Sequence, residues 1–567
     1  MKRSPGSLWL GVYLLAVILA ASASTSYAAE PDRPITLVQD GKPVATIVIR
    51  RDAPQVIKQA AEDLQHYVEL MSGAKLPIAT DDQAVDGVRL LVGHTRGGGV
   101  KFDIDLGFDG SLVLTTSNDT LVFRGPNDQG AANGVYWFIE WKLGAHRFGL
   151  RNDALVVPQQ KTIVIESFNY SHKPSFAWRA SWISSINQIY SEEEIANYQQ
   201  YLSLNRGGGV NLSGAHSLEY LVPPDKYFAE HPEYFPLIDG KRQAHGQLCV
   251  SNPDVLRIIV EELKQRDPNV EQYAAVSPND HAGWCECDAC KAMGEDPAAR
   301  LVVFCNRVVE ALEPTHPKLG VCFLAYNVSQ TMEPPVGLKA HHRVVPLIAP
   351  LSGEAVHPLT DEHCPNSAQL RRIYDGWAQV ADQVATYPYM YGEPLENILP
   401  TPVPAVVVKD IRYYHDMGVM GLQREHVGHY GARGIGWELS YWLEWQLMWD
   451  IDRDVEELRE VFFAGYYGGA AEPMKRIYAR LENAVMSAAP GTIKRRRGAM
   501  DCGKNVIAVV APTMADNLAD IAEARRLADT DAAKTHVAID EELLNALVRR
   551  IEEPAEAVPN PGPAQDE

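Results

Sequence analysis

Residues 299–326 read ARLVVFCNRVVEALEPTHPKLGVCFLAY, a helical pattern followed by an unbroken apolar run. The run 319–326 has the length and composition of a strand that is buried on both faces. Apolar strands and helices alternate in the same way from Phe176 to about Asp450. The other predicted strands are 177–184, 208–214, 270–278, 343–350, 384–392 and 418–427, and the predicted helices include 253–266 and 366–383. This alternation predicts an α/β protein with a (β/α)8-type TIM barrel over residues 172–450, in which seven strands can be located and the eighth cannot.

A smaller unit precedes the barrel. Residues 35–50 alternate and turn at Asp40-Gly41-Lys42, which predicts a hairpin, and residues 54–73 show helical spacing that ends at Gly73. Further predicted elements are a strand at 88–94, a hairpin at 110–125 and a helix at 130–144. We therefore predict a small α/β domain over residues 34–165, with one sheet and its helices on one face.

The chain after the barrel has a different pattern. Residues 455–468 and 473–489 show helical periodicity, and a long polar segment covers 513–552. The end of the chain is acidic and rich in proline. We predict C-terminal helices over 451–552 and a disordered tail over 553–567.

The first residues have the pattern of an export signal. Lys2 and Arg3 precede the apolar run 8–21, and Ser26 and Ala28 suit a signal peptidase site. The alternative is an uncleaved membrane anchor, but the run is short for a span of ~20 residues. We predict a signal peptide over 1–28 and an exported protein, periplasmic or extracellular, with no membrane association after cleavage.

The net charge and the absence of nucleotide-binding motifs limit the kinds of ligand that the sequence predicts. The 567 residues include 73 Asp and Glu against 52 Lys and Arg, a net charge of −21. Proteins that bind the phosphate backbone of nucleic acids normally carry a basic surface, so no nucleic-acid partner is expected. The chain has no Walker loop, no dinucleotide fingerprint and no G-x-S-x-G elbow, so we predict no cofactor.

Carboxylates follow three of the predicted strands. In such barrels the reaction is carried by the loops at the C-terminal strand ends. The strand 270–278 leads into Asn279 and Asp280, the strand 384–392 leads into Glu393, and the last predicted strand contains Glu425. Glycosidic bonds are cleaved when one acid protonates the leaving oxygen and a second group stabilises or attacks the anomeric carbon. Asp280, Asn279, Glu425 and Glu393 are therefore the candidate catalytic residues.

Side chains suited to sugars lie close to these acids in the sequence. Aromatic rings can stack on the C–H faces of a pyranose, and polar side chains can bind its hydroxyl groups. The candidate substrate-binding residues are His216, Arg179, Trp182, Trp284, Tyr389, Tyr391 and Arg424. By contrast, Trp442, Trp445 and Trp449 share one face of the predicted helix 436–450, a pattern that is typical of a core.

Four cysteines form a separate group. Cys285, Cys287 and Cys290 follow Asp280 closely, and Cys249 lies upstream. Thiolates in this number can form a tetrahedral zinc site, whereas export favours disulfides or leaves free thiols. These alternatives stay open at the level of sequence, and no catalytic metal is predicted.

Three segments carry a resemblance to a known family: HPEYFPLIDGKR (231–242), QLCVSNPDV (247–255) and VSPNDHAGWCECDAC (276–290). They resemble the bacterial domain of unknown function 4838, part of which has been placed in glycoside hydrolase family 163, endo-β-N-acetylglucosaminidases acting on N-glycans. The late segment with Glu425 is similar to the barrel end of the same family. Residues 130–148, GAANGVYWFIEWKLGAHRF, resemble the small domain that precedes the barrel in α-glucuronidases and β-hexosaminidases.

The resemblance implies a retaining, substrate-assisted reaction on an oligosaccharide or a glycoprotein glycan. In that reaction the 2-acetamido oxygen of the sugar attacks the anomeric carbon. By analogy with related barrels, Asn279 would orient the acetamido group and Asp280 would protonate the leaving oxygen. The pair departs from the Asp-Glu pair of β-hexosaminidases, so Glu393 or Glu425 is the alternative acid.

Two other functions are compatible with the sequence. The first is an α-glucuronidase-like hydrolase of plant polysaccharide, in which Arg179, Arg206 and Arg424 would hold a uronate. The second is a barrel that binds glycans without cleaving them, which the unusual Asn279-Asp280 pair suggests.

Overall fold

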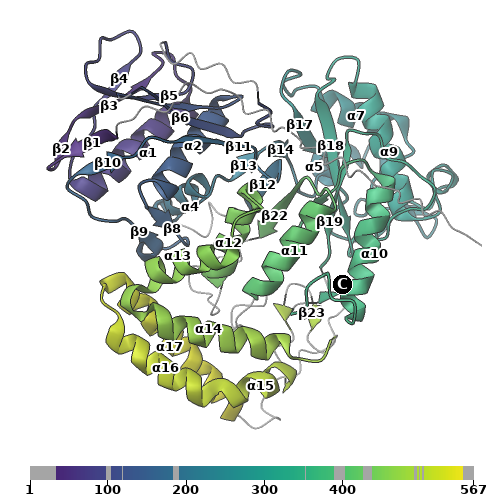
Figure 1. Ribbon diagram of the computed structural model, residues 1–567. Coiled ribbons are helices and arrows are strands. Elements are labelled where there is room, and N and C mark those ends of the chain that lie inside the picture. Colours follow the sequence, from purple (N-terminus) through teal and green to yellow (C-terminus); the bar gives the residue numbers. More distant parts are fainter. Residues whose placement is uncertain are drawn as a thin grey trace, which may run out of the picture.

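The structure is a computed structural model, shown in Figure 1. It describes residues 34–96, 104–117, 119–182, 191–351, 353–354, 356–388, 403–425, 437–490, 494–496, 499–500 and 504–552. The predicted signal peptide and the predicted tail lie outside these residues. Three regions follow one another along the chain: a small α/β domain, a barrel and a group of C-terminal helices.

The small domain contains a six-stranded sheet in the order β11-β6-β7-β5-β3-β4. Its strands are β3 (Ala45–Ile49), β4 (Ile78–Thr80), β5 (Val88–Val92), β6 (Ser111–Ser117), β7 (Thr120–Arg124) and β11 (Asn169–His172). Helices α1 (Gln55–Ser72) and α2 (Asp128–Trp141) pack against each other and share one core with the sheet. The larger sheet thus has the predicted arrangement with both helices in one core, but the single sheet predicted for this domain is divided into two.

The first hairpin of this domain is present at the predicted turn, but only residues 42–43 after the turn pair with the first strand. Strands β1 (Ile35–Gln39) and β2 (Lys42–Pro43) are antiparallel, and Asp40 and Gly41 both have positive φ, as a two-residue turn requires. They form a second sheet with β10 (Ile163–Ile165), whereas β3 joins the larger sheet. Strand β11 was not predicted, because its polar sequence before Pro174 resembles a break.

The barrel is built from seven parallel strands at the positions that the sequence predicted. They are β12 (Trp178–Trp182), β14 (Asn211–Leu212), β17 (Gln272–Ala275), β18 (Leu319–Tyr326), β19 (Val344–Ala349), β21 (Ala385–Thr386) and β22 (Gly421–Glu425). Alternate residues of β18 face opposite cores. Cys322, Leu324 and Tyr326 belong to the barrel interior, whereas Val321 and Phe323 pack under the helices. Burial on both sides explains the unbroken apolar runs.

The eighth strand of this sheet has an unexpected origin. Strand β22 pairs directly with β12, and the eighth strand is β13 (Gly208–Gly209), which runs antiparallel to β12 and leads at once into β14. A Cβ atom on Gly209 would lie 2.0 Å from the Ala177 carbonyl oxygen, so only glycine permits this closure. The single predicted strand 208–214 therefore becomes two short ones that bridge opposite edges of the sheet.

Helices cover the outside of the barrel (Figure 1). They are α4 (Glu192–Leu204), α7 (Pro253–Leu263), α9 (Pro297–Leu312), α10 (Pro365–Val380), α11 (Pro404–Asp416) and α12 (Trp437–Trp449). Four of them begin with proline, whose fixed φ suits the first helical position. Trp442, Trp445 and Trp449 are buried, so the predicted core role of this stripe is confirmed.

Short elements connect these regions. Between β14 and α7 lie α5 (Leu218–Leu221), α6 (Pro224–Tyr227), η2 (Pro232–Tyr234) and the hairpin β15 (Leu237–Ile238) to β16 (Lys241–Arg242). The remaining short elements are β8 (His146–Arg147), η1 (Asn152–Ala154), β9 (Leu155–Val156), α8 (Asp288–Lys291) and β20 (Gly353–Glu354). These loops carry several of the candidate site residues.

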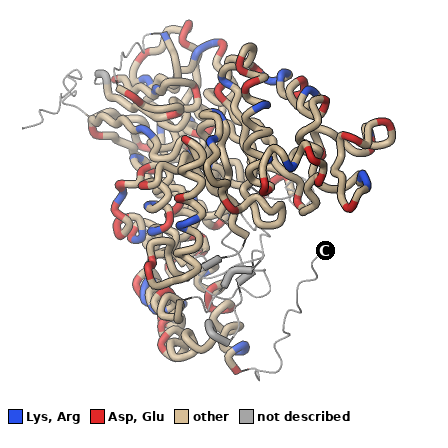
Figure 2. Tube along the Cα trace, turned by 90° about the vertical axis from the view of Figure 1, so that its right-hand side faces the viewer, with Lys and Arg blue, Asp and Glu red and all other residues tan. Residues whose placement is uncertain are grey.

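The C-terminal helices pack on the barrel through α12 and α13 and share its outer core. They comprise α13 (Val455–Tyr467), η3 (Gly468–Ala470), α14 (Ala471–Met486), α15 (Lys504–Val510), η4 (Ala511–Thr513), α16 (Met514–Leu527) and α17 (Asp531–Glu552). In the side view they form the narrower lower part of the molecule (Figure 2). Strand β23 (Lys494–Arg496) pairs with β20, which follows the carboxyl end of β19, and β24 (Ala499–Met500) pairs with the other edge of β23. Among the described helices, none is both long enough and apolar enough to cross a bilayer.

A buried acid on α17 makes the stability of this region depend on pH. Burial raises the pKa of Asp540 to about 7, and its neighbours include Tyr467, Glu438 and His536. Because the folded-state pKa lies above the unfolded value, the stability that Asp540 contributes is fully present below about pH 4 and is lost as the pH rises from about 4 to about 7. We expect Asp540→Asn to remove this loss, so that the variant exceeds wild type by about 2–4 kcal/mol at alkaline pH.

Denaturant unfolding at several pH values measures this difference. Glu542→Gln, an exposed change on the same helix, is the matched control and should follow wild type throughout. Parallel stability curves for Asp540→Asn and wild type would show that Asp540 ionises freely in the folded protein.

Candidate active site at the carboxyl end of the barrel

Asp280 and His216 meet at the carboxyl ends of two neighbouring strands. His216 follows β14 and Asp280 follows β17, and these strands are paired in parallel. The His216 Nε2 atom lies 3.7 Å from Asp280 Oδ1. The Asp280 side chain is 63% exposed and that of His216 is 30% exposed. Both groups are therefore accessible at the end of the barrel where enzymes of this fold carry their chemistry.

The other imidazole nitrogen fixes the orientation of the His216 ring. His216 Nδ1 lies 2.5 Å from the Pro278 carbonyl oxygen, which can only accept, so Nδ1 carries a proton. Nε2, on the opposite side of the ring, faces the Asp280 carboxyl group at 3.7 Å. A carboxyl group with an imidazole beside it is a pair of side chains of the kind that general acid–base catalysis uses.

Asn279 has a different task from the one predicted. Its side chain is only 5% exposed, its Oδ1 accepts from the backbone N–H of Glu219 at 2.9 Å, and its Nδ2 donates to the Gly246 carbonyl at 2.9 Å. Gln247 also bonds the backbone N–H and carbonyl of Asn279. Both ends of the carboxamide are used, so it does not point at a substrate. Asn279 instead fixes the strand end from which Asp280 projects.

Two arginines proposed to bind substrate lie on the outer face of the barrel sheet. The Arg179 guanidinium bonds Asp109 of the small domain and the carbonyls of Phe176 and Arg206. That of Arg424 bonds Glu444 on α12 and the Pro388 carbonyl. Both side chains are buried, so the prediction that they contact substrate is wrong; strand alternation points them toward the helices.

Trp284 is likewise a core residue. Its ring is 7% exposed within the core beneath the barrel helices, and its Nε1 donates to the Ser329 carbonyl at 2.8 Å. The expected stacking platform for a sugar is therefore a packing residue.

The remaining candidates are placed only in part. Glu425 is the last residue of β22 and pairs in register with Trp182, the last residue of β12. Both therefore stand at the same end of the barrel as Asp280. Tyr389, Tyr391 and Glu393 lie outside the described residues, so their roles stay predictions.

Two residues at this end of the barrel were not predicted. The ring of Tyr326, the last residue of β18, lies 5.7 Å from that of His216. Gln423 lies against Gly214, where a Cβ atom would come within 2.7 Å of Gln423 Oε1. Tyr326 ends an apolar strand, a position that could have identified it, whereas no sequence signal marks Gln423.

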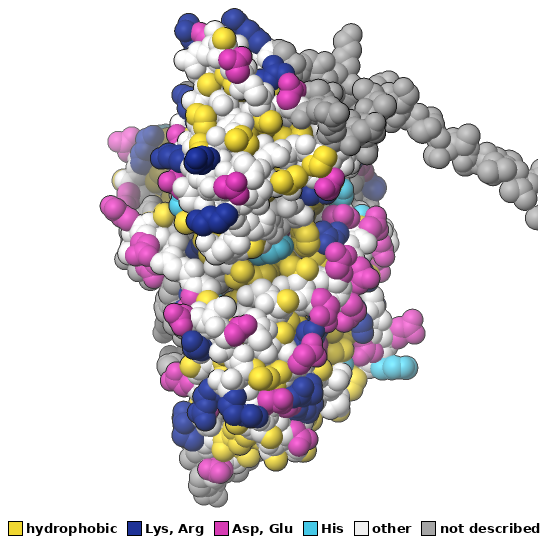
Figure 3. Space-filling model, turned by 60° about the vertical axis from the view of Figure 1, so that its left-hand side comes forward, with side chains coloured by type: hydrophobic (Ala, Val, Ile, Leu, Met, Phe, Trp, Pro, Cys, Tyr) yellow, Lys and Arg dark blue, Asp and Glu magenta, His cyan; other side chains and the backbone are white. Residues whose placement is uncertain are grey.

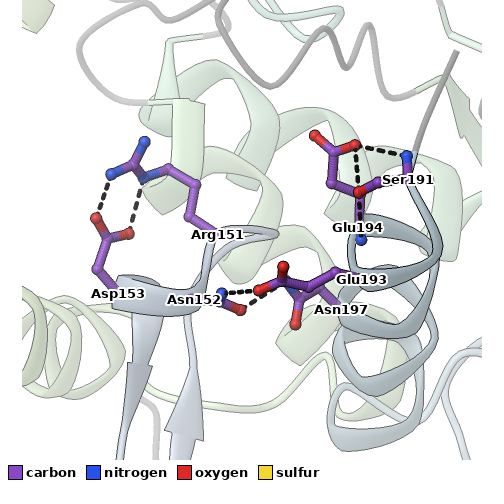
Figure 4. A pocket seen from close by; sticks show the side chains of 7 residues that line it. All are labelled: Arg151, Asn152, Asp153, Ser191, Glu193, Glu194 and Asn197. Carbon is purple, nitrogen blue, oxygen red and sulfur yellow. Dashed lines mark hydrogen bonds and ion pairs between the residues drawn. The ribbon is translucent and has the colours of Figure 1, made fainter.

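A hollow of about 470 Å³ lies between η1 and the start of α4, away from the Asp280 and His216 pair (Figure 4). Its polar side chains bond one another: Asn152 Nδ2 donates to Glu193 and Asn197 Nδ2 donates to Asn152. Ser191 and Glu194 form a capping box, and Arg151 pairs with Asp153. Because these side chains bond one another, the hollow is a contact region between η1 and α4, and we do not assign it a ligand.

Two groups in the described part of the chain have the composition of a metal site. Glu313, His341 and His342 lie largely at the surface, where such groups are common without an ion. Cys249, Cys285, Cys287 and Cys290 converge in a mostly buried cluster. Three of these cysteines lie on the loop that continues from Asp280, and Cys249 lies between β16 and α7. Neither group includes the Asp280 carboxylate.

Residues 150–480, more than half of the chain, match the family described as "Domain of unknown function (DUF4838)". The chain belongs to this family. The matched range contains every barrel strand, the Asp280 and His216 pair, Glu425 and the cysteine cluster. No curated protein matches the chain.

Solved structures share the fold of this DUF4838 protein at low sequence identity. One is a family GH115 4-O-methyl-α-glucuronidase with specificity for decorated arabinogalactans, with a TM-score of 0.56 and 13% identity, covering 92% of this chain and 75% of that one. Another is a family 89 glycoside hydrolase from Clostridium perfringens in complex with PUGNAc, with a TM-score of 0.51 and 10% identity, covering 88% of this chain and 63% of that one. At such identity the likeness concerns the fold, and the small domain and the barrel are both included in it.

Proposed function

We propose that this DUF4838 protein is an exported glycoside hydrolase that cleaves amino-sugar-containing glycans. The observation that carries the proposal is the accessible Asp280 and His216 pair at the carboxyl end of the barrel. The glycoside hydrolases that share this fold, and the family resemblance of the segment around Asp280, support a glycosidic substrate. Residues 1–28 would be removed on export.

The proposed reaction assigns one step to each described group. Asp280 in its protonated form protonates the leaving oxygen while the sugar's own acetamido oxygen attacks the anomeric carbon. Water then attacks the same carbon and opens the cyclic intermediate, and the proton that this water loses returns to the Asp280 carboxylate. His216 positions the Asp280 carboxyl group for both steps. Because the Asn279 carboxamide is bonded elsewhere, Glu425 at the end of β22 takes the task of orienting the acetamido group.

The face of the molecule shown in Figure 3 carries charges of both signs. On the face shown in Figure 3, Lys and Arg form small separate groups among the acidic side chains of the described residues. Such a mixed surface offers no extended basic patch for steering a polyanion on that face.

An α-glucuronidase activity is the second candidate, favoured by the likeness to the family GH115 enzyme. Such an activity requires a positively charged side chain that binds the carboxylate of the uronic acid. The three arginines considered for that task, Arg179, Arg206 and Arg424, are all buried and paired with Asp109, Glu140 and Glu444. This arrangement weakens the candidate.

Substrate specificity separates the two candidates. Purified full-length protein is incubated with aryl β-N-acetylglucosaminides, N-glycoproteins and glucuronoxylan, and released sugars are identified by mass spectrometry. Release of N-acetylglucosamine or of N-glycans supports the proposal, provided that Glu425→Gln abolishes it. Release of uronic acid alone, or tight glycan binding without turnover, contradicts it.

Replacing His216 is expected to slow the reaction. Replacing it by alanine removes the imidazole beside the Asp280 carboxyl group and should lower kcat by about 10²-fold, with a shifted pH profile. A matched change at His245, which is exposed nearby, should leave kcat unchanged. A pH profile of His216→Ala identical to that of wild type would mean that Asp280 works without this histidine.

A further inference from the structure

Four cysteine sulfurs converge on one point beside the barrel. Cys249 follows the hairpin β15–β16, and Cys285, Cys287 and Cys290 lie on the loop after β17. All four sulfur atoms lie within 4.8 Å of one another. Cys249, Cys285 and Cys290 are buried and Cys287 is partly exposed, so the cluster is nearly closed to solvent.

The distances between the sulfurs fit one tetrahedral ion. A zinc–sulfur bond of about 2.3 Å in a regular tetrahedron places neighbouring sulfurs about 3.8 Å apart. Cys249 Sγ lies 3.7 Å from Cys287 Sγ and 3.8 Å from Cys290 Sγ. A disulfide would bring two sulfurs to about 2.05 Å. Cys249 is about equally close to two other cysteines, as expected when all three bind the same metal ion.

The surroundings supply donors to sulfur. The backbone N–H groups of Leu237 and Cys290 point at Cys285 and Cys287, each at 3.4 Å. The Ser251 hydroxyl can donate to Cys249 Sγ at 3.5 Å, and Arg242 Nη1 lies 3.7 Å from Cys285 Sγ. Donors of this kind stabilise negative charge on metal-bound thiolates.

We propose that Cys249, Cys285, Cys287 and Cys290 bind one zinc ion as a closed structural site. Four protein ligands leave no position for water, so the ion takes no part in hydrolysis. Its effect is to fix the loop after β17 against the segment before α7. Gln247, two residues before Cys249, bonds both backbone groups of Asn279, so the ion also helps to hold the strand end that carries Asp280.

Metal content tests the site independently of any enzymatic activity. Full-length protein is purified without chelators and its zinc is measured by plasma mass spectrometry, with an expected ratio of about one per chain. Cys290→Ala should lower the ratio by at least about tenfold. Cys305→Ala, a change at a buried cysteine outside the cluster, should retain the ion.

If Cys290→Ala does not fold, two measurements on the wild-type protein test the site. Unfolding in the presence of a chelator and an alkylating reagent should label Cys249, Cys285, Cys287 and Cys290. Titration of the native protein with a mercurial should release the zinc as four thiols react. Cluster cysteines that resist alkylation because they form disulfides, or a folded wild-type protein without zinc, would overturn the site.

Discussion

Replacing Asp280 by asparagine is expected to lower kcat/KM on natural glycans by about 10³-fold, because a poor leaving group departs only when an acid protonates it. The asparagine side chain has nearly the same size but cannot give up a proton. The loss should be much smaller on aryl glycosides with acidic phenols, since such leaving groups need little protonation. Steady-state kinetics on both substrate types measure the difference.

A matched change separates chemistry from folding. Asp267 is exposed on the loop that leads into the same strand from its opposite end, so Asp267→Asn should retain wild-type rates on every substrate. Equal losses on natural and activated substrates in Asp280→Asn would assign Asp280 to binding. The acid would then have to be sought at Glu425 or Glu393.

The barrel could be predicted because its strands are short apolar runs at regular intervals. Residues 319–326 form a strand over the predicted range. The closure through β13 could not be predicted, because antiparallel pairing of Gly208 and Gly209 with β12 depends on a contact between distant segments. The local pattern at 208–214 indicates only an extended chain.

The sequence predicted which strand ends form the candidate site better than it predicted which side chains point into it. Asp280 does project from the end of β17, but Arg179 and Arg424 face outward. In a strand that is buried on both faces, alternation shows which residues share a face without showing which face is the interior. Their partners, Asp109 and Glu444, belong to other elements, and no local pattern joins them.

The largest effect on stability is expected at the junction of the small domain, the barrel and α12. Arg206 donates to Glu140 on α2 at 2.5 Å and to Gln446 on α12 at 3.0 Å, and Gln446 donates to Glu140. All three side chains are buried, and the Arg206 guanidinium lies 5.3 Å from the centre of the Trp449 ring. Burial alone would raise the pKa of Glu140, but Arg206 and His146 bring it below its ordinary value. The carboxylate therefore stays charged in the core.

Arg206→Ala should accordingly destabilise the protein by about 3–5 kcal/mol, because it leaves the Glu140 charge buried without its partner. Chemical unfolding measures this, with Arg372→Ala at the exposed Arg372–Glu333 pair as the control, for which at most about 1 kcal/mol is expected. The double variant Glu140→Met with Arg206→Met should recover much of the loss, since it removes both charges and keeps apolar volume. If Arg206→Ala costs no more than the exposed control, then the junction tolerates an unpaired carboxylate. The small domain and the barrel would in that case be joined mainly by apolar packing such as that of Trp449.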